Sequence, residues 1–138
     1  AASAADRSVP ARRALAVLLG EGWRIRHGLR WAGPGDIDHV AISPTGLAFA
    51  IETKTRSFDA RHLARVRDQA GWLLERRRRW CLRGAVAVLC LTCGRAASPR
   101  HPDVIVVSIQ ELTSTLRAAA GSVARPGFLT CGEAGRSR

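Results

Sequence analysis

The residues of this 138-residue chain best suited to chemistry lie between positions 35 and 55. There, Asp38 and Glu52 sit on two apolar runs that a short turn joins, and Lys54 follows the glutamate by two residues. Carboxylate oxygens bind hard divalent cations such as Mg²⁺, and a lysine beside them neutralises a phosphate. The spacing therefore predicts a site that holds a divalent cation against a phosphodiester.

Two strands joined by a tight turn must carry these residues. The apolar pattern predicts strands over residues 36–43 and 47–53. Between them, Pro44 presets φ and Gly46 accepts a positive φ, which is typical of a turn. A β-hairpin is therefore the element that positions the two acids.

The register of that hairpin decides whether the two acids meet. If Ser43 pairs with Leu47, counting back places Asp38 opposite Glu52, with their Cβ atoms about 5 Å apart. Lys54 then shares a face with Glu52, because side chains alternate along a strand. Two carboxylates this close repel unless a cation lies between them or one takes up a proton. A register shifted by one residue would break the alignment.

Mg²⁺, or Mn²⁺ in its place, is the cofactor that this arrangement suits. We expect Asp38, Glu52 and the backbone carbonyl of Thr53 to be its protein ligands, since Mg²⁺ commonly takes one or two carboxylates and keeps several waters. Such an ion acidifies a bound water, and Lys54 would position that water or neutralise the scissile phosphate. Asp36 shares the face of Asp38 on its strand and is a candidate accessory residue. The alternative is an exposed hairpin face with ordinary ion pairs.

The rest of the chain predicts an α/β fold. Apolar periodicity and end signals favour helices over 10–19, 59–80 and 110–119, and further strands over 23–29, 85–91 and 104–108. The unbroken apolar run from Ala85 to Leu91 is typical of a central strand covered on both faces. The expected order is α-β-β-β-α-β-β-α, a mixed β-sheet flanked by helices.

The chain is expected to form one domain between two flexible tails. Residues 1–8 and 121–138 carry little apolar periodicity, so the domain is placed over residues 9–120. A loop is expected over residues 94–102, because Gly and Pro punctuate that segment.

The charge of the chain points to a polyanionic partner. Lys and Arg number 22 against 11 Asp and Glu, and every cation except Lys54 is an arginine. Arginine forks match phosphate geometry and are weakly hydrated, which favours nucleic acid. The alternative is an Arg-rich composition without a binding role. The candidates for contact with the nucleic-acid backbone all lie on the helix predicted over 59–80: Arg61, Arg65, Arg76, Arg77, Arg78 and Arg79.

Two further features of that helix leave alternatives open. The run from Arg76 to Arg79 could instead be a solvated helix end, where cations interact well with the helix dipole. Trp72 and Trp80 lie near the run and could stack on bases, although core packing suits Trp72 better.

A cytoplasmic setting without membrane contact is expected. No apolar run approaches the roughly 18 residues of a membrane span, and four cysteines do not form a disulfide framework in a chain of this length. Cys90 and Cys93, with His101 and Cys131, could bind zinc. Buried, unreactive cysteines are the better interpretation, because Cys90 ends an apolar strand.

The stretch from Ile37 to Lys54 resembles the central motif of the PD-(D/E)XK nuclease superfamily, and most closely that of the nuclease-related domain (NERD) family. The family pattern is an Ile-Asp-His-hydrophobic strand, a glycine turn, and a strand that ends in Glu-x-Lys. The matching residues stand in the same order: Ile37, Asp38, His39, Val40, Gly46, Glu52 and Lys54. The likeness covers roughly residues 11–110.

The resemblance implies a restriction-endonuclease-like fold, with Asp38 and Glu52 as metal ligands and Lys54 as the catalytic lysine. It also implies a catalytic glutamine on the helix after the third strand, a position that Gln69 matches. The function expected from it is Mg²⁺-dependent hydrolysis of DNA phosphodiester bonds by an endo- or exodeoxyribonuclease.

One departure from the family pattern concerns the first helix. Relatives often carry a glutamate there that completes the metal cluster, whereas the helix predicted over residues 10–19 has no acid. Glu21, just past its end, is a candidate replacement. The alternative function is therefore a weakly active or inactive nucleic-acid-binding module on the same fold.

Overall fold

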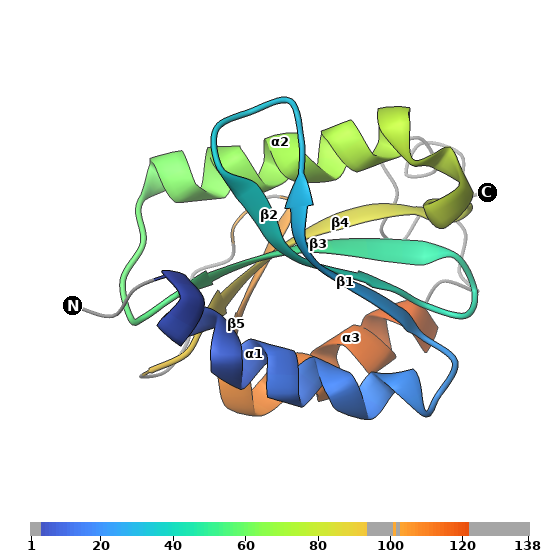
Figure 1. Ribbon diagram of the computed structural model, residues 1–138, viewed down its shortest axis with the longest axis horizontal. Helices are drawn as coiled ribbons and strands as arrows, with labels where there is room; N and C mark the ends of the chain where they lie inside the picture. The colour runs from blue at the N-terminus through green and yellow to red at the C-terminus, as the bar shows by residue number, and fades with distance from the viewer. Residues whose placement is uncertain (1–3, 94–100, 102, 122–138) are drawn as a thin grey trace.

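A five-stranded mixed sheet carries most of the candidate residues. The computed structural model describes residues 4–93, 101 and 103–121. Its strands are β1 (Arg24–Arg30), β2 (Asp36–Ile42), β3 (Leu47–Lys54), β4 (Gly84–Leu91) and β5 (Val104–Ser108). They lie side by side in chain order, with β1, β2 and β3 antiparallel and β3, β4 and β5 parallel (Figure 1). The predicted mixed sheet is confirmed.

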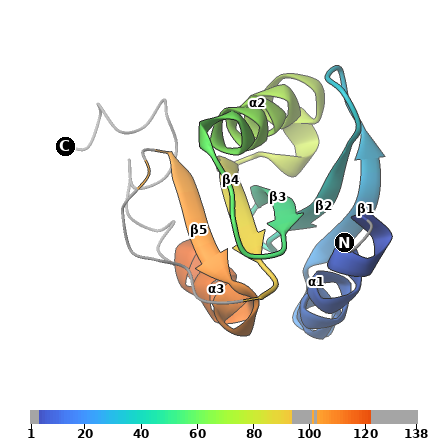
Figure 2. The same cartoon turned by 90° about the vertical axis from the view of Figure 1, so that its left-hand side faces the viewer.

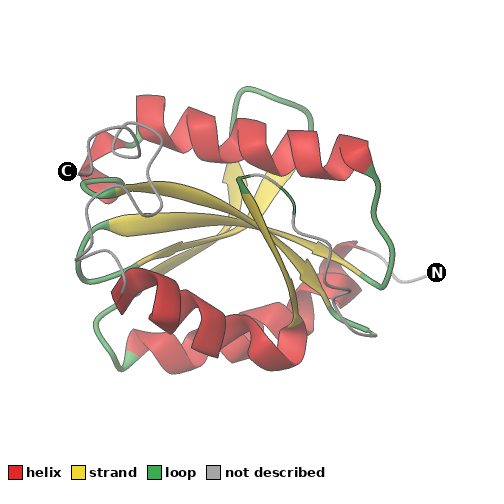
Figure 3. Ribbon diagram, turned by 180° about the vertical axis from the view of Figure 1, so that it is seen from behind, coloured by secondary structure: helices red, strands yellow, loops and turns green. Residues whose placement is uncertain are grey.

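Helices cover both faces of this sheet. One face packs against α1 (Ala4–Leu19) and α3 (Leu112–Gly121), and the other against α2 (Ala60–Arg76), as Figure 3 shows from behind. Short 3₁₀ segments, η1 (Arg78–Trp80) and η2 (Ile109–Glu111), follow α2 and precede α3. Among the described residues, no helix has the length and apolar character to cross a bilayer.

The two faces of β3 are packed differently. Toward α1 and α3 it places large side chains, among them Phe49, whose ring stacks on Trp23 with centroids 5.8 Å apart. Toward α2 it places Ala48 and Ala50. The small side chains leave room for the apolar stripe of α2, including the fully buried Leu73. Strand alternation then directs the next even-numbered residue to the α2 face, and that residue is Glu52.

The first helix is longer than the sequence pattern predicts. We predict a start at Pro10, because proline is favoured in the first turn, but α1 begins at Ala4 and contains Pro10. Proline removes the backbone hydrogen bond to the carbonyl four residues earlier, here that of Asp6. The alanines before it favour helix, so the helix continues through this position. The helix therefore includes an acid, Asp6, and the expectation of an acid-free first helix is wrong.

The second helix is shorter than predicted. It ends at Arg76 instead of Trp80, because Arg77 adopts φ −131° and residues 78–80 tighten into η1. An unbroken helix would hold arginines three residues apart on one side, where like charges repel. Residues 1–3 and 122–138 of the predicted tails, and most of the loop predicted over 94–102, lie outside the described residues.

The carboxyl end of β3 lies between the beginnings of two helices (Figure 2). Asp59 caps α2 by accepting hydrogen bonds from the backbone N–H groups of Arg61 and His62. On the other side, Ser8 and Arg12 from the first half of α1 lie near the β1–β2 hairpin. Both helices therefore present their N-terminal halves where β3 ends.

Candidate active site

The hairpin of β2 and β3 has the predicted register. Ser43 donates its backbone N–H to the carbonyl of Leu47 at 2.9 Å, and the ladder keeps that register as far as His39. One residue further, the same register sets Asp38 level with Glu52. The predicted alignment of the hairpin is therefore confirmed.

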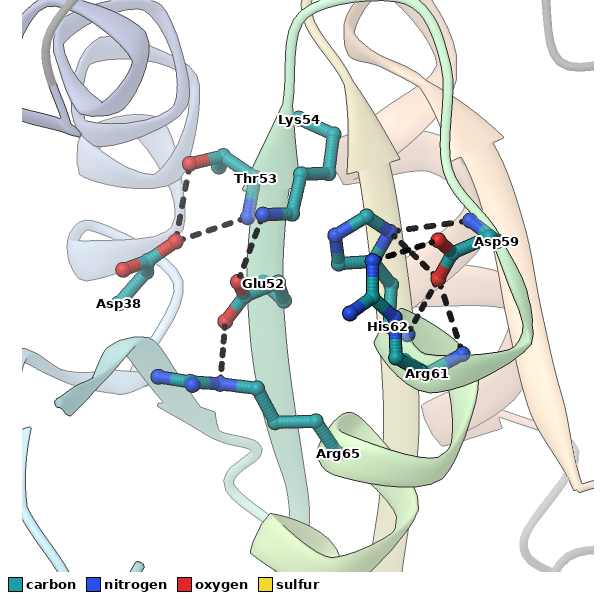
Figure 4. A network of polar contacts seen from close by, with 8 residues as sticks. All are labelled: Asp38, Glu52, Thr53, Lys54, Asp59, Arg61, His62 and Arg65. Carbon is teal, nitrogen blue, oxygen red and sulfur yellow. Dashed lines mark hydrogen bonds and ion pairs between the residues drawn. The ribbon is translucent and has the colours of Figure 1, made fainter. Parts of the chain in front are cut away.

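Thr53 holds the carboxylate of Asp38. Oδ2 of Asp38 accepts a hydrogen bond from the backbone N–H of Thr53 at 2.9 Å and from its hydroxyl at 3.0 Å (Figure 4). Both bonds use the same carboxylate oxygen. From the sequence we expect Thr53 only as a carbonyl ligand, which stays a prediction, whereas the structure assigns it an anchoring role. The sequence feature that could have indicated this role is the hydroxyl of Thr53, which stands between the glutamate and the lysine of the motif.

Glu52 is the buried centre of the site, with 6% of its surface exposed. Nζ of Lys54 lies 3.6 Å from Oε2, and Nε of Arg65 lies 3.8 Å from Oε1. Both distances are longer than those of typical hydrogen bonds, so the two cations balance the charge of Glu52 mainly by electrostatic attraction. Among the described residues, Oε1 has no hydrogen-bond partner.

Two opposing effects act on the pKa of Glu52. Burial raises this pKa, and the negative charge of Asp38 raises it further, whereas the charges of Arg65 and Lys54 lower it. The balance leaves the pKa of Glu52 above its ordinary value. A divalent cation bound to both carboxylates would relieve the repulsion.

The donor set fits Mg²⁺ or Mn²⁺. Glu52 offers a buried carboxylate oxygen free of hydrogen bonds, and Asp38 is a second carboxylate held level with it. Among the side chains that the structure describes, which begin at Ser8, no three of His, Cys, Asp or Glu are grouped to share a metal. Two carboxylates are a common protein share for Mg²⁺, whose other positions go to water and phosphate.

Arg65 enters the site from α2. The sequence predicts it only as a contact to the nucleic-acid backbone, but the structure places its guanidinium between Glu52 and the β1–β2 hairpin. A Cβ atom at Gly35 would lie 2.6 Å from a terminal nitrogen of Arg65. Gly35 also has φ +67°, a backbone conformation that favours glycine, whereas the flexible end of Arg65 could shift away from an added Cβ atom.

Gln69 lies one helical turn beyond Arg65 and is fully buried. Neither its amide oxygen nor its amide nitrogen has a hydrogen-bond partner among the described residues. Buried polar side chains are normally hydrogen-bonded. A water or ligand group is therefore expected beside this amide.

Two acids considered as accessory residues lie elsewhere. Glu21 follows the far end of α1, and its carboxylate accepts hydrogen bonds from Arg117 at 2.9 and 2.8 Å, which lower the pKa of Glu21. The structure does not bring Glu21 to Asp38, because the length of α1 separates them. Asp36 is exposed and lines a cavity on the α1 side of Asp38.

The arginines predicted to contact nucleic acid divide into two groups. Arg61 and Arg65 lie in the first two turns of α2, where β3 ends. The run from Arg76 to Arg79 lies at the other end of the helix, about 18 Å from Arg65 by helical rise. The second group therefore lies away from Lys54, at the opposite end of α2 from the site.

The tryptophans near this run are covered by arginines. The guanidinium of Arg77 lies 5.3 Å from the ring centre of Trp72 and 5.4 Å from that of Trp80. Arg26 of β1 lies 5.6 Å from the ring of Trp80. These cation–π contacts hold η1 against β1 and α2, and they occupy rings that we considered for base stacking.

The histidine of the motif, His39, lies on the opposite face of the sheet from Asp38, because side chains alternate along β2. Nδ1 of His39 is 2.7 Å from Nδ1 of His27, so one nitrogen donates and the other accepts. Burial lowers the pKa of His39 to about 4, with smaller contributions from His27 and Arg12. Burial and the charge of Arg12 also lower the pKa of His27.

Cys90, on the apolar strand, is buried as predicted, and Cys81 is buried as well, but the expectation of a buried Cys93 is wrong, because it lies beyond the end of β4. Burial raises the pKa of Cys90 to about 12 and that of Cys81 to about 11, which suits unreactive thiols. Cys93 is exposed, and Cys131 lies outside the described residues.

The arrangement of sheet, helices and hairpin defines a restriction-endonuclease-like fold. Its central parallel strand ends in Glu52-Thr53-Lys54, and the neighbouring antiparallel strand sets Asp38 level with the glutamate. The family model of the nuclease-related domain (NERD) matches residues 7–83, more than half of the chain, and the chain belongs to this family. No curated protein and no solved structure gives a significant match.

The buried histidine predicts a dependence of stability on pH. The pKa of His39 is about 4 in the folded protein against an ordinary value of 6.5, so the unfolded chain binds more protons between these values. Stability from neutral His39 is present above pH 6.5 and is lost as the pH falls to and below 4, by about 3 kcal/mol in total.

Urea denaturation at pH 7.5 and pH 5 measures this loss in the wild type and in His39→Gln. We expect a clearly smaller decline in the variant. The difference in stability between the two proteins at pH 7.5 gives the cost of changed packing alone. The difference between their declines from pH 7.5 to pH 5 gives the contribution of His39 protonation. Equal declines in both proteins would contradict the assignment.

Proposed function

We propose that this nuclease-related domain is a metal-dependent nuclease that hydrolyses DNA phosphodiester bonds. The observation that supports it best is Glu52, a buried carboxylate level with Asp38, flanked by Lys54 and Arg65, with one oxygen free of hydrogen bonds. Mg²⁺ or Mn²⁺ bound there supplies an acidified water and offsets negative charge on the phosphate.

Each residue of the site has a distinct part in this proposal. Asp38 and Glu52 hold the cation, with the backbone carbonyl of Thr53 as a further ligand. Lys54 positions the attacking water or neutralises the scissile phosphate, because it lies beside Glu52 and stays partly exposed. The buried amide of Gln69 binds a water that supports this geometry.

The reaction is a direct hydrolysis without a covalent intermediate. The water oxygen forms a bond to phosphorus while the bond to one ester oxygen breaks. The attacking water loses its proton to solvent, and the leaving oxygen gains one. The products are a phosphate monoester and a hydroxyl end.

Plasmid nicking in Mg²⁺, Mn²⁺ or EDTA tests this assignment. We expect Asp38→Asn and Glu52→Gln to lower the cleavage rate by about 10³-fold or more, because each removes a charged ligand where transition-state charge is balanced. EDTA should abolish cleavage by the wild type.

Glu75→Gln is the matched control, since Glu75 is an exposed glutamate near the end of α2. It makes the same chemical change far from the site and should cleave like the wild type. A stability measurement separates a folding defect from a loss of function. The fold raises the pKa of Glu52, so the ionised carboxylate lowers the stability of the folded protein. Glu52→Gln should therefore unfold at a urea concentration no lower than the wild type. Cleavage that survives either substitution would overturn the site.

A second candidate is a nucleic-acid-binding module on the same fold without turnover. The observation that favours it is that the described side chains bring only two carboxylates together at the end of β3. If the protein binds DNA but cleaves it neither in Mg²⁺ nor in Mn²⁺, the binding module is the correct function.

Both candidates share a basic surface that contacts the nucleic-acid backbone. We assign Arg61 and Arg65 to the part next to the site and Arg76 to Arg79 to the far end of α2. With Trp72 and Trp80 engaged by arginines, the far group is suited to phosphates, which carry no sequence information.

The salt dependence of DNA binding tests the far group. Each phosphate contact contributes about 0.9 to the slope of log affinity against log salt concentration, so Arg78→Gln with Arg79→Gln should lower that slope by about 2. Fluorescence anisotropy with a labelled duplex measures it. Arg13→Gln removes one exposed charge from α1 and reports the effect of net charge alone. An unchanged slope in the double variant would exclude the far group.

A further inference from the structure

A cavity on the α1 side of Asp38 has no part in the function proposed so far. Its volume is about 440 Å³, within the range of ligand sites. Arg12 of α1, His27 of β1, and Asp38 and His39 of β2 are among the residues that line it. Because Asp38 also lies level with Glu52, the cavity adjoins the proposed cation site.

The two histidines leave one proton donor for a ligand. Each neutral ring carries one N–H, and one of the two Nδ1 atoms must donate to the other. The ring that accepts at Nδ1 must carry its own proton on Nε2. The hydrogen bond between the two rings does not use that Nε2–H. His39 is 1% exposed, and its Nε2 has no hydrogen-bond partner among the described residues. A donating Nδ1–H on His39 leaves the free Nε2–H on the half-buried His27.

Arg12 supplies positive charge at the same place. It is exposed and lines the same cavity as His27 and His39, and its charge lowers the pKa of both histidines. Within the described part of the chain, its guanidinium makes no ion pair with a carboxylate. The next residue, Arg13, is equally exposed but does not line the cavity.

We propose that this cavity is a subsite for a second phosphate of the substrate strand, adjacent to the scissile one, and that Arg12 and His27 bind it. The strand then crosses Asp38 from the Lys54 and Arg65 side to the α1 side. This inference rests on the proposed function for the identity of the strand. The carboxylates of Asp36 and Asp38 oppose an anion here, so binding is expected to be stronger with a divalent cation present.

Arg12→Gln and Arg13→Gln form a matched pair, because they remove the same charge from neighbouring exposed positions. Anisotropy with a labelled single-stranded oligonucleotide, in Ca²⁺ and in EDTA, measures the affinity of each. Loss of a charged phosphate contact should weaken binding in Ca²⁺ about tenfold for Arg12→Gln. Arg13→Gln should change it no more than about twofold. In Mg²⁺, Arg12→Gln should raise KM and leave kcat within about twofold.

A structural readout locates the contact. Titration with thymidine 3′,5′-bisphosphate in Ca²⁺ should shift the imidazole NMR signals of His27 and His39 in the wild type and in Arg13→Gln. The shifts should be lost or much smaller in Arg12→Gln. Unmoved histidine signals in the wild type, or equal affinities of the two arginine variants, would overturn the subsite.

These measurements fail independently of the nuclease proposal. If the wild type does not cleave but the arginine variants differ in affinity, the subsite stands and the nuclease assignment is wrong. If cleavage is normal and Arg12→Gln behaves like Arg13→Gln, the nuclease assignment stands and the subsite is wrong.

Discussion

The burial of the Glu52 carboxylate is the constraint on which the rest of the site depends. An ionised group removed from water costs on the order of several kcal/mol unless opposite charge balances it. Lys54 and Arg65 provide that charge from β3 and α2 at 3.6 and 3.8 Å. The guanidinium of Arg65 also lies close to Gly35, where an added Cβ atom would be 2.6 Å from its terminal nitrogen. A single buried acid thus ties together a strand end, a helix and the tip of a hairpin.

The same constraint makes the site responsive to a cation. Lys54 and Arg65 balance the charge of Glu52 from 3.6 and 3.8 Å, and the charge of Asp38 still raises its pKa. The site therefore keeps two carboxylates together at a cost to stability, which proteins tolerate at functional positions. Thr53 contributes by fixing Asp38, so that repulsion from Glu52 does not turn the aspartate away.

The hairpin was predictable because its determinants are local. Pro44 and Gly46 define the turn, and a turn that pairs Ser43 with Leu47 fixes the register that sets Asp38 level with Glu52. The positions of Arg65 and Glu21 could not be predicted from the sequence, because they depend on contacts between elements far apart in the chain. An arginine on α2 reaches Glu52 only once the helix packs on β3, and Glu21 pairs with Arg117 only once α1 meets α3.

The central claim is that Asp38 and Glu52 together bind one divalent cation at the end of β3. Titration with Mn²⁺, followed by electron paramagnetic resonance of the free ion, measures this directly and needs neither substrate nor turnover. The account predicts one bound Mn²⁺ per chain in the wild type and in Glu75→Gln, and loss of that ion in Asp38→Asn and in Glu52→Gln. A bound Mn²⁺ that persists undiminished in Asp38→Asn or in Glu52→Gln, or a wild type that binds none, would contradict it.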